Sequence, residues 1–90
     1  GAMTAFEEEQ NWRSILIAEL RAMPDEDLVQ RTLLAIRLFK RARTDDRLYD
    51  EANYCAFECR QPGRRAGLWT EAHRRYLLEL VERRTHDNHH

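Results

Sequence analysis

Apolar residues recur at helical spacing through the stretch from Asp25 to Arg43, which contains no glycine or proline. On a helical wheel turning about 100° per residue, five of them and Thr32 form the stripe expected of a buried helix face: Leu28, Thr32, Ala35, Ile36, Phe39 and Ala42. Leu34 and Leu38 form a second apolar pair on the polar side, between Arg31 and Arg41. Either this helix is central in a bundle and covered on two sides, or the pair is a ridge for another chain with arginines at its rim.

A second helix is predicted over about Ala5 to Ala22. Thr4 and Glu7 match a capping box, and the acids that follow suit the positive end of a helix dipole. Its broad apolar face consists of Phe6, Trp12, Leu16, Leu20 and Met23. Pro24 ends this helix, because the residue before a proline avoids the helical region. The short joint predicts an antiparallel hairpin with the helix that starts at Asp25.

A third helix is predicted over about Asp46 to Arg60, after a break near Thr44 where good N-cap residues follow a basic helix end. Most of its apolar side chains are small and form a narrow stripe: Leu48, Ala52, Cys55, Ala56 and Cys59. Tyr54 and Phe57 form an aromatic pair on another side. Either the stripe is buried and the aromatic pair is a binding surface, or the two faces have the opposite roles.

Gln61, Pro62 and Gly63 stop that helix, and a basic loop follows. The fourth helix starts at Gly67 or Thr70 and reaches about Arg84, with one broad apolar face: Trp69, His73, Tyr76, Leu77, Leu80 and Val81. The pattern therefore predicts an all-α fold, a compact bundle of three to four helices that forms a homodimer. We expect a single domain over residues 4–85 and a frayed polar tail over 86–90. Gly1 and Ala2 resemble the scar of a tag-removing protease, with Met3 as the native start.

The composition excludes several classes of protein. Hydrophobic residues make up 42% and charged residues 34% of the 90 positions, which is too apolar for a disordered chain and too charged for a membrane protein. No apolar run approaches the roughly 20 residues of a membrane span, and no signal peptide is evident. Two cysteines do not make a disulfide scaffold, so we expect a reducing, cytoplasmic location.

The net charge of −1 is unevenly distributed along the chain. Residues 1–30 hold seven acids and two bases, residues 31–59 hold five acids and six bases, and residues 60–90 hold four acids and seven bases. A basic cluster surrounds the predicted turn before the last helix: Arg60, Arg64, Arg65, Arg74 and Arg75. A small DNA-binding transcriptional regulator using these arginines is the alternative function. The acids spread through every helix, and the low overall charge, favour arginines that are solvated or paired with protein acids instead.

Candidate catalytic and metal chemistry is sparse. Cys55 and Cys59 lie one helical turn apart, but a structural zinc needs about four nitrogen or sulfur ligands. Only His73 and the tail histidines, His86, His89 and His90, could complete such a set. We therefore expect buried free thiols and neither a metal nor a cofactor. His73 lies on an apolar face without an identifiable nucleophile or carboxylate partner, so we expect no enzyme.

In length, helical content, arginine-rich mixed charge and surplus apolar faces (Leu34 with Leu38, Tyr54 with Phe57), the chain resembles small helical inhibitor proteins of bacteria and phages. These include antiactivators of LuxR-type quorum-sensing regulators and anti-CRISPR proteins. The resemblance implies a helical protein, often dimeric, that occupies a functional surface of a transcription regulator and stops activation. It assigns no individual residue. From the wheel positions we predict a protein–protein interface at Arg31, Leu34, Leu38, Arg41, Tyr54 and Phe57.

Overall fold

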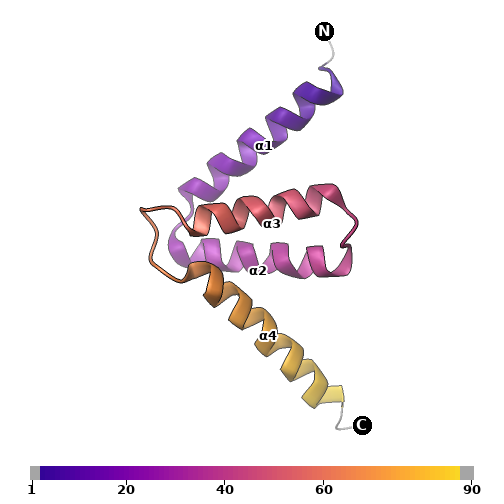
Figure 1. The fold of residues 1–90 in the computed structure, drawn as a ribbon, viewed down its shortest axis with the longest axis vertical. Helices are drawn as coiled ribbons and strands as arrows, with labels where there is room; N and C mark the ends of the chain where they lie inside the picture. Colours follow the sequence, from indigo (N-terminus) through magenta and orange to yellow (C-terminus); the bar gives the residue numbers. More distant parts are fainter. Residues whose placement is uncertain (1–2, 88–90) are drawn as a thin grey trace.

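The computed structural model describes residues 3–87 of the chain, and in that part it contains four helices and no strand (Figure 1). The helices are α1 (Ala5–Ala22), α2 (Asp25–Arg41), α3 (Asp46–Cys59) and α4 (Leu68–Asp87). The prediction of an all-α fold with three to four helices is therefore confirmed. Among these residues, no helix is both long and apolar enough to cross a membrane. The predicted scar at Gly1 and Ala2 and the tail residues 88–90 lie outside the described residues.

Local capping sets the helix boundaries. The Thr4 side chain accepts a hydrogen bond from the Glu7 amide at 3.1 Å, so α1 begins where the capping box predicts. The Asp45 carboxylate accepts from the Leu48 amide at 3.0 Å and starts α3, which confirms the break near Thr44. At the other end, α4 continues to Asp87. The predicted helix end at Arg84 was therefore too early.

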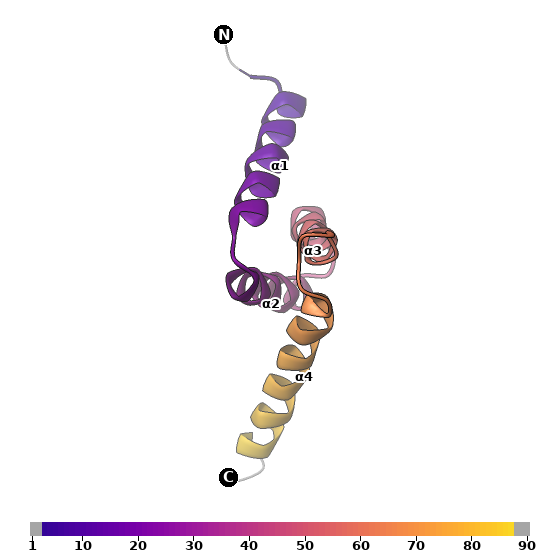
Figure 2. The same cartoon turned by 90° about the vertical axis from the view of Figure 1, so that its left-hand side faces the viewer.

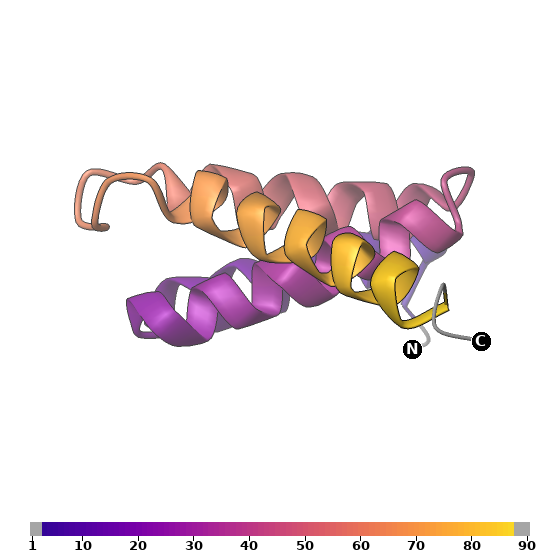
Figure 3. The ribbon, with the colours of Figure 1, turned by 90° about the horizontal axis from the view of Figure 1, so that it is seen from below.

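The four helices do not form a compact up-and-down bundle. α2 and α3 lie side by side and antiparallel, and α4 runs obliquely beneath them (Figures 1 and 3). α1 leaves the start of α2 at a steep angle and extends away from the α2–α3 pair (Figure 2). The predicted hairpin of α1 with α2 is wrong. α1 packs against α3, where the Arg13 guanidinium meets Asp50 at 3.0 Å.

The buried core lies where α2 meets the other helices. It contains ten apolar side chains: Leu16, Leu20, Leu28, Val29, Ala35, Ile36, Cys55, Cys59, Leu68 and Ala72. The stripe predicted for α2 supplies much of this core, and its Thr32 is fully buried with its hydroxyl 3.4 Å from the Cys59 sulfur. Because both cysteines are buried, α3 presents its small-residue stripe to the core, and the opposite orientation is wrong.

The molecule is elongated. Its radius of gyration is 15.6 Å, whereas a compact domain of 90 residues has about 12 Å. Its principal extents are 58, 31 and 15 Å, with α1 and α4 directed to opposite ends (Figures 1 and 2). The chain exposes 6498 Å² of surface, whereas a compact monomer of 10.8 kDa exposes about 5,500 Å². The compactness expected from the sequence is therefore wrong, and the surplus surface comes from helices that diverge.

Candidate protein-interaction site

The outer face of α2 carries a shallow groove of about 630 Å³. Seven residues line it: Met23, Asp27, Gln30, Arg31, Leu33, Leu34 and Arg37. Leu34 is 40% exposed although it is a large apolar residue, and Leu38, one turn further on, is half-buried. Exposed apolar side chains within a groove are typical of a surface that receives another chain.

This groove is open because the neighbouring helices occupy the other faces of α2. On the α3 side, Arg31 forms an ion pair with Glu51, and both side chains are largely buried. On the α4 side, the Arg37 guanidinium donates to Glu79 through two nitrogens, one of them at 2.9 Å. This hydrogen bonding lowers the pKa of the Glu79 carboxyl and raises the pKa of Arg37. Both arginines are therefore fixed as edges of the groove.

The predicted rim residues differ in what they can offer a partner. Arg31 was predicted as an interface arginine, but its guanidinium is already engaged by Glu51. Arg41 is exposed at the C-terminal end of α2, beside Lys40 and Arg43, which are exposed as well. The exposed positive charge near Leu34 and Leu38 therefore lies at the C-terminal end of α2, and it does not flank the two leucines on both sides.

Tyr54 and Phe57 do not act as one aromatic face. Tyr54 is half-buried and packs against the core, whereas Phe57 is 61% exposed on the outside of α3. An i,i+3 pair spans about 60° of the helix circumference, which is enough for the edge of the core to separate the two rings. Phe57 alone remains a candidate contact on this side.

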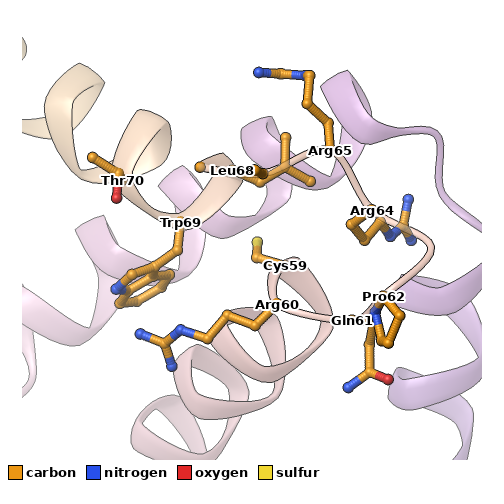
Figure 4. A pocket seen from close by; sticks show the side chains of 11 residues that line it. Cys59, Arg60, Gln61, Pro62, Arg64, Arg65, Leu68, Trp69 and Thr70 are labelled. Carbon is orange, nitrogen blue, oxygen red and sulfur yellow. The ribbon is translucent and has the colours of Figure 1, made fainter.

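The arginines of the predicted nucleic-acid surface point in different directions. Figure 4 shows Arg60, Arg64 and Arg65 around the loop that precedes α4, where a hollow of about 510 Å³ lies. Arg60 reaches back so that its guanidinium lies 5.4 Å from the centre of the Trp69 ring. Arg64 points toward the junction of α1 and α2, and Arg65 extends the opposite way. The three guanidinium groups do not converge on a common ligand position.

Most of these arginines are neutralised within the chain. Arg65 pairs with Glu71 at 2.7 Å, and Arg75 pairs with both Glu26 and Glu71 at 2.7 and 2.9 Å. Each hydrogen-bonded arginine lowers the pKa of the glutamate that it contacts. A phosphate-binding surface needs concentrated, uncompensated positive charge. The arrangement therefore does not favour the DNA-binding alternative.

Arg64 has a structural role that the sequence did not reveal. Its side chain is only 10% exposed, and its guanidinium donates to the carbonyl oxygens of Leu20 at 2.8 Å and of Met23. It also lies 3.2 Å from the Asp25 carboxylate and 3.6 Å from that of Glu58, which is buried. Arg64 thereby adds a second donor to the Leu20 carbonyl oxygen, which already accepts from the Met23 amide, and supplies a side-chain donor to the Met23 carbonyl oxygen at the end of α1.

The cysteines are held as neutral thiols. Cys55 is fully buried, and burial raises the pKa of its thiol to about 11. Burial also raises the pKa of Cys59, although the Thr32 hydroxyl beside it opposes this effect. Among residues 3–85, whose side chains the structure describes, no group of three or more His, Cys, Asp or Glu side chains is placed to hold a metal ion. The predicted tail candidates His86, His89 and His90 lie outside that range.

His73 belongs to a small hollow where α2, α3 and α4 meet. Its ring makes an edge-on contact with Trp69 at 4.3 Å between ring centres. The hollow has a volume of about 160 Å³ and is mostly apolar, lined by Ile36, Phe39, Lys40, Tyr49, Ala52, Asn53, Trp69 and His73. His73 Nδ1 is buried and makes no hydrogen bond within the described part of the chain. The residues that line this hollow include no Ser, Thr, Cys, Asp or Glu side chain.

Sequence reasoning missed the apolar side chains exposed on α1 and α4. Phe6 is 71% and Ile15 51% exposed on α1, while Leu77, Leu78 and Val81 are 47–58% exposed on α4. Leu77 and Val81 were predicted within a single broad core face. Only the part of that face nearest α2 is covered. Periodicity identifies an apolar face, but it does not show how much of a wide face another helix of the chain will cover.

We found no family model, characterised protein or solved structure that matches the chain. The function is therefore assigned from the chain's own residues.

Proposed function

We propose that the chain is a non-catalytic interaction module, acting as a homodimer, that binds a regulatory protein and blocks its activity. The observation that carries the proposal is the open groove on α2 with Leu34 exposed in it and Leu38 beside it. An inhibitor needs only a surface that its target binds more tightly than the target's natural partner. A rigid helix with a formed groove meets this need because little ordering is required on binding.

The groove favours an amphipathic helix as its occupant. In helix-in-groove recognition, the bound helix inserts apolar anchors spaced at i, i+3 or i+4. Leu34 lines the groove and Leu38 follows one turn later on α2, so the two could contact successive anchors of such a helix. The exposed bases at the end of α2, Lys40, Arg41 and Arg43, favour acidic residues at the corresponding end of the bound helix. The expected target segment is therefore an acidic amphipathic helix of the regulatory protein.

The test compares two charge substitutions on opposite surfaces. Leu34→Glu places a carboxylate in the groove, and Phe57→Glu makes the same chemical change on the outside of α3. Each tagged protein is used to capture partners from a lysate of the source organism, after circular dichroism has confirmed its helical content. We expect the wild type and Phe57→Glu to retain one stoichiometric protein that Leu34→Glu loses.

The captured protein is then purified, and its own activity is measured with and without the wild-type chain. Inhibition by the wild type and by Phe57→Glu, but not by Leu34→Glu, supports the proposal. Equal capture by both variants shows that the α2 groove is not the binding surface. Loss of capture with Phe57→Glu alone would move the target surface to α3.

A further inference from the structure

Two helical arms leave the α2–α3 pair with exposed apolar side chains. The α1 arm, residues 3–15, exposes Met3 and Phe6 near its start, and it exposes Ile15 on the opposite side of the helix from Phe6. The α4 arm, residues 74–85, exposes Leu77, Leu78 and Val81. Isolated exposed apolar residues are common on protein surfaces, but three neighbours within one turn of a helix are a patch. Each arm therefore has apolar surface that the rest of the chain leaves uncovered.

The two arms carry opposite charge. The α1 arm holds Glu7, Glu8 and Glu9 against one base, Arg13. The α4 arm holds four arginines against two glutamates, and Arg74, Arg83 and Arg84 are all exposed. Acids lie in the first turns of α1, and bases lie in the last turns of α4. An antiparallel pairing of the two arms would bring these ends together.

The arms cannot meet within one molecule. Figures 1 and 2 show α1 and α4 extending to opposite ends of a molecule 58 Å long. A two-fold axis perpendicular to that length would place α1 of one copy beside α4 of the other, in antiparallel orientation. The helices have 18 and 20 residues, so they match in length at about 27 and 30 Å. The contact would form twice and close the dimer.

We infer that a second copy of this chain covers the arms, with the acidic α1 arm of each copy packed against the basic α4 arm of the other. The area agrees with this occupant. The chain exposes 6498 Å², about 1,000 Å² more than a compact monomer of its mass, and a protein–protein interface of standard size buries about 800 Å² on each partner. This inference rests on the proposed function only in taking the chain to be a dimer, and it locates the dimer surface away from the α2 groove.

The test is a charge exchange between two variants of the full chain. In the first, Glu7→Arg and Glu8→Arg make the α1 arm basic. In the second, Arg83→Glu and Arg84→Glu make the α4 arm acidic. Each variant alone would then oppose like charges at both contacts, whereas an equimolar mixture would pair opposite charges at both. Sedimentation equilibrium at low ionic strength gives the dimer dissociation constant in each case.

We expect each variant alone to dimerise at least about tenfold more weakly than the wild type, and the mixture to recover a heterodimer close to wild-type affinity. The recovered heterodimer also shows that both variants fold. Val81→Glu interrupts the apolar patch on α4. Added to the wild type it should give a monomer, and added to both charge variants it should prevent the heterodimer from forming in their mixture. A wild-type chain that stays monomeric, or variants that dimerise alone as well as when mixed, would overturn the inference.

The two proposals fail separately. Leu34→Glu should dimerise as the wild type does, because the groove lies on α2 whereas the proposed dimer contacts lie on the arms of α1 and α4. If the wild type is a monomer and still captures its target, the proposed dimer surface is refuted and the proposed binding at the α2 groove stands. If the wild type dimerises through the arms but captures no target at the groove, the proposed function is refuted and the dimer surface stands.

Discussion

Replacing Arg64 with methionine should destabilise the protein more than any other single arginine substitution on the loop before α4. Methionine keeps the length and apolar stem of the side chain but removes the guanidinium. The Met23 carbonyl oxygen would lose its guanidinium donor, and the Leu20 carbonyl oxygen would keep only the Met23 amide. The buried Glu58 carboxylate would lose the better buried of its two arginine partners. These groups lie where water cannot readily replace Arg64, whose side chain is 10% exposed.

The expected cost follows from these contacts. A hydrogen bond from a charged donor contributes about 1.5–3 kcal/mol, and breaking a buried ion pair costs about 3–5 kcal/mol because one charge stays buried. The two contributions overlap, so we expect a loss of about 3–5 kcal/mol. A domain of 90 residues has a free energy of unfolding of about 5–13 kcal/mol. Even for the smallest loss and the largest total, the substitution should therefore remove about a quarter of the stability.

Urea unfolding, followed by circular dichroism at one fixed protein concentration, measures this loss. The matched control is Arg65→Met on the adjacent residue, whose solvent-exposed pair with Glu71 should contribute little to stability. In the double variant with Glu58→Met, part of the loss should be recovered, because the buried carboxylate that keeps only the exposed Arg21 as a partner is then absent. If Arg64→Met and Arg65→Met differ by less than about 0.5 kcal/mol, the structural role assigned to Arg64 is refuted.

Two further predictions concern ionisation. Since burial raises the pKa of Cys55 from its ordinary value near 9 to about 11, the unfolded chain releases this proton first as the pH rises. The free energy of unfolding should therefore fall by up to about 2–3 kcal/mol between pH 9 and 11, and Cys55→Ala should flatten that limb of a urea-denaturation pH series; an unchanged limb would show that Cys55 is not buried as a thiol. At acid pH the sign is opposite, because Arg37 holds the pKa of Glu79 below its ordinary value. The stabilisation by this pair is complete above the ordinary glutamate pKa of about 4.3 and is lost as the pH falls through the lowered value, so Glu79→Gln should make the acid limb shallower in the same measurement; a limb as steep as that of the wild type would contradict the pairing.

The helices themselves could be predicted from local sequence because local groups determine them. Thr4 and Asp45 cap α1 and α3 through hydrogen bonds to amides three residues away. Pro24 separates α1 from α2. The buried stripe of α2 follows from periodicity, since its residues face the same direction whatever covers them. Each of these features needs information from only a few neighbouring positions.

The direction of α1 could not be predicted, because residues distant in the sequence determine it. Arg64 contacts carbonyl oxygens more than 40 positions earlier in the chain, at the end of α1, and Arg13 reaches Asp50 across 37 positions. The same limit affected the basic cluster, where counting arginines cannot show that Glu26 and Glu71 neutralise Arg75. Charge composition predicts a potential binding surface only until the pairing within the fold is known.

The two candidate surfaces have one structural cause. α3 and α4 already cover two faces of α2, so an α1 that folded back as a hairpin would have to cover the remaining face, which carries Leu34. That arrangement would close the groove and also withdraw the acidic arm from the end of the molecule. Arg64 ties the end of α1 to the loop before α4, and Arg13 holds α1 against α3, so α1 is directed away from α2. The contacts that fix this fold therefore also leave open the groove proposed for the target and the arm proposed for the second copy.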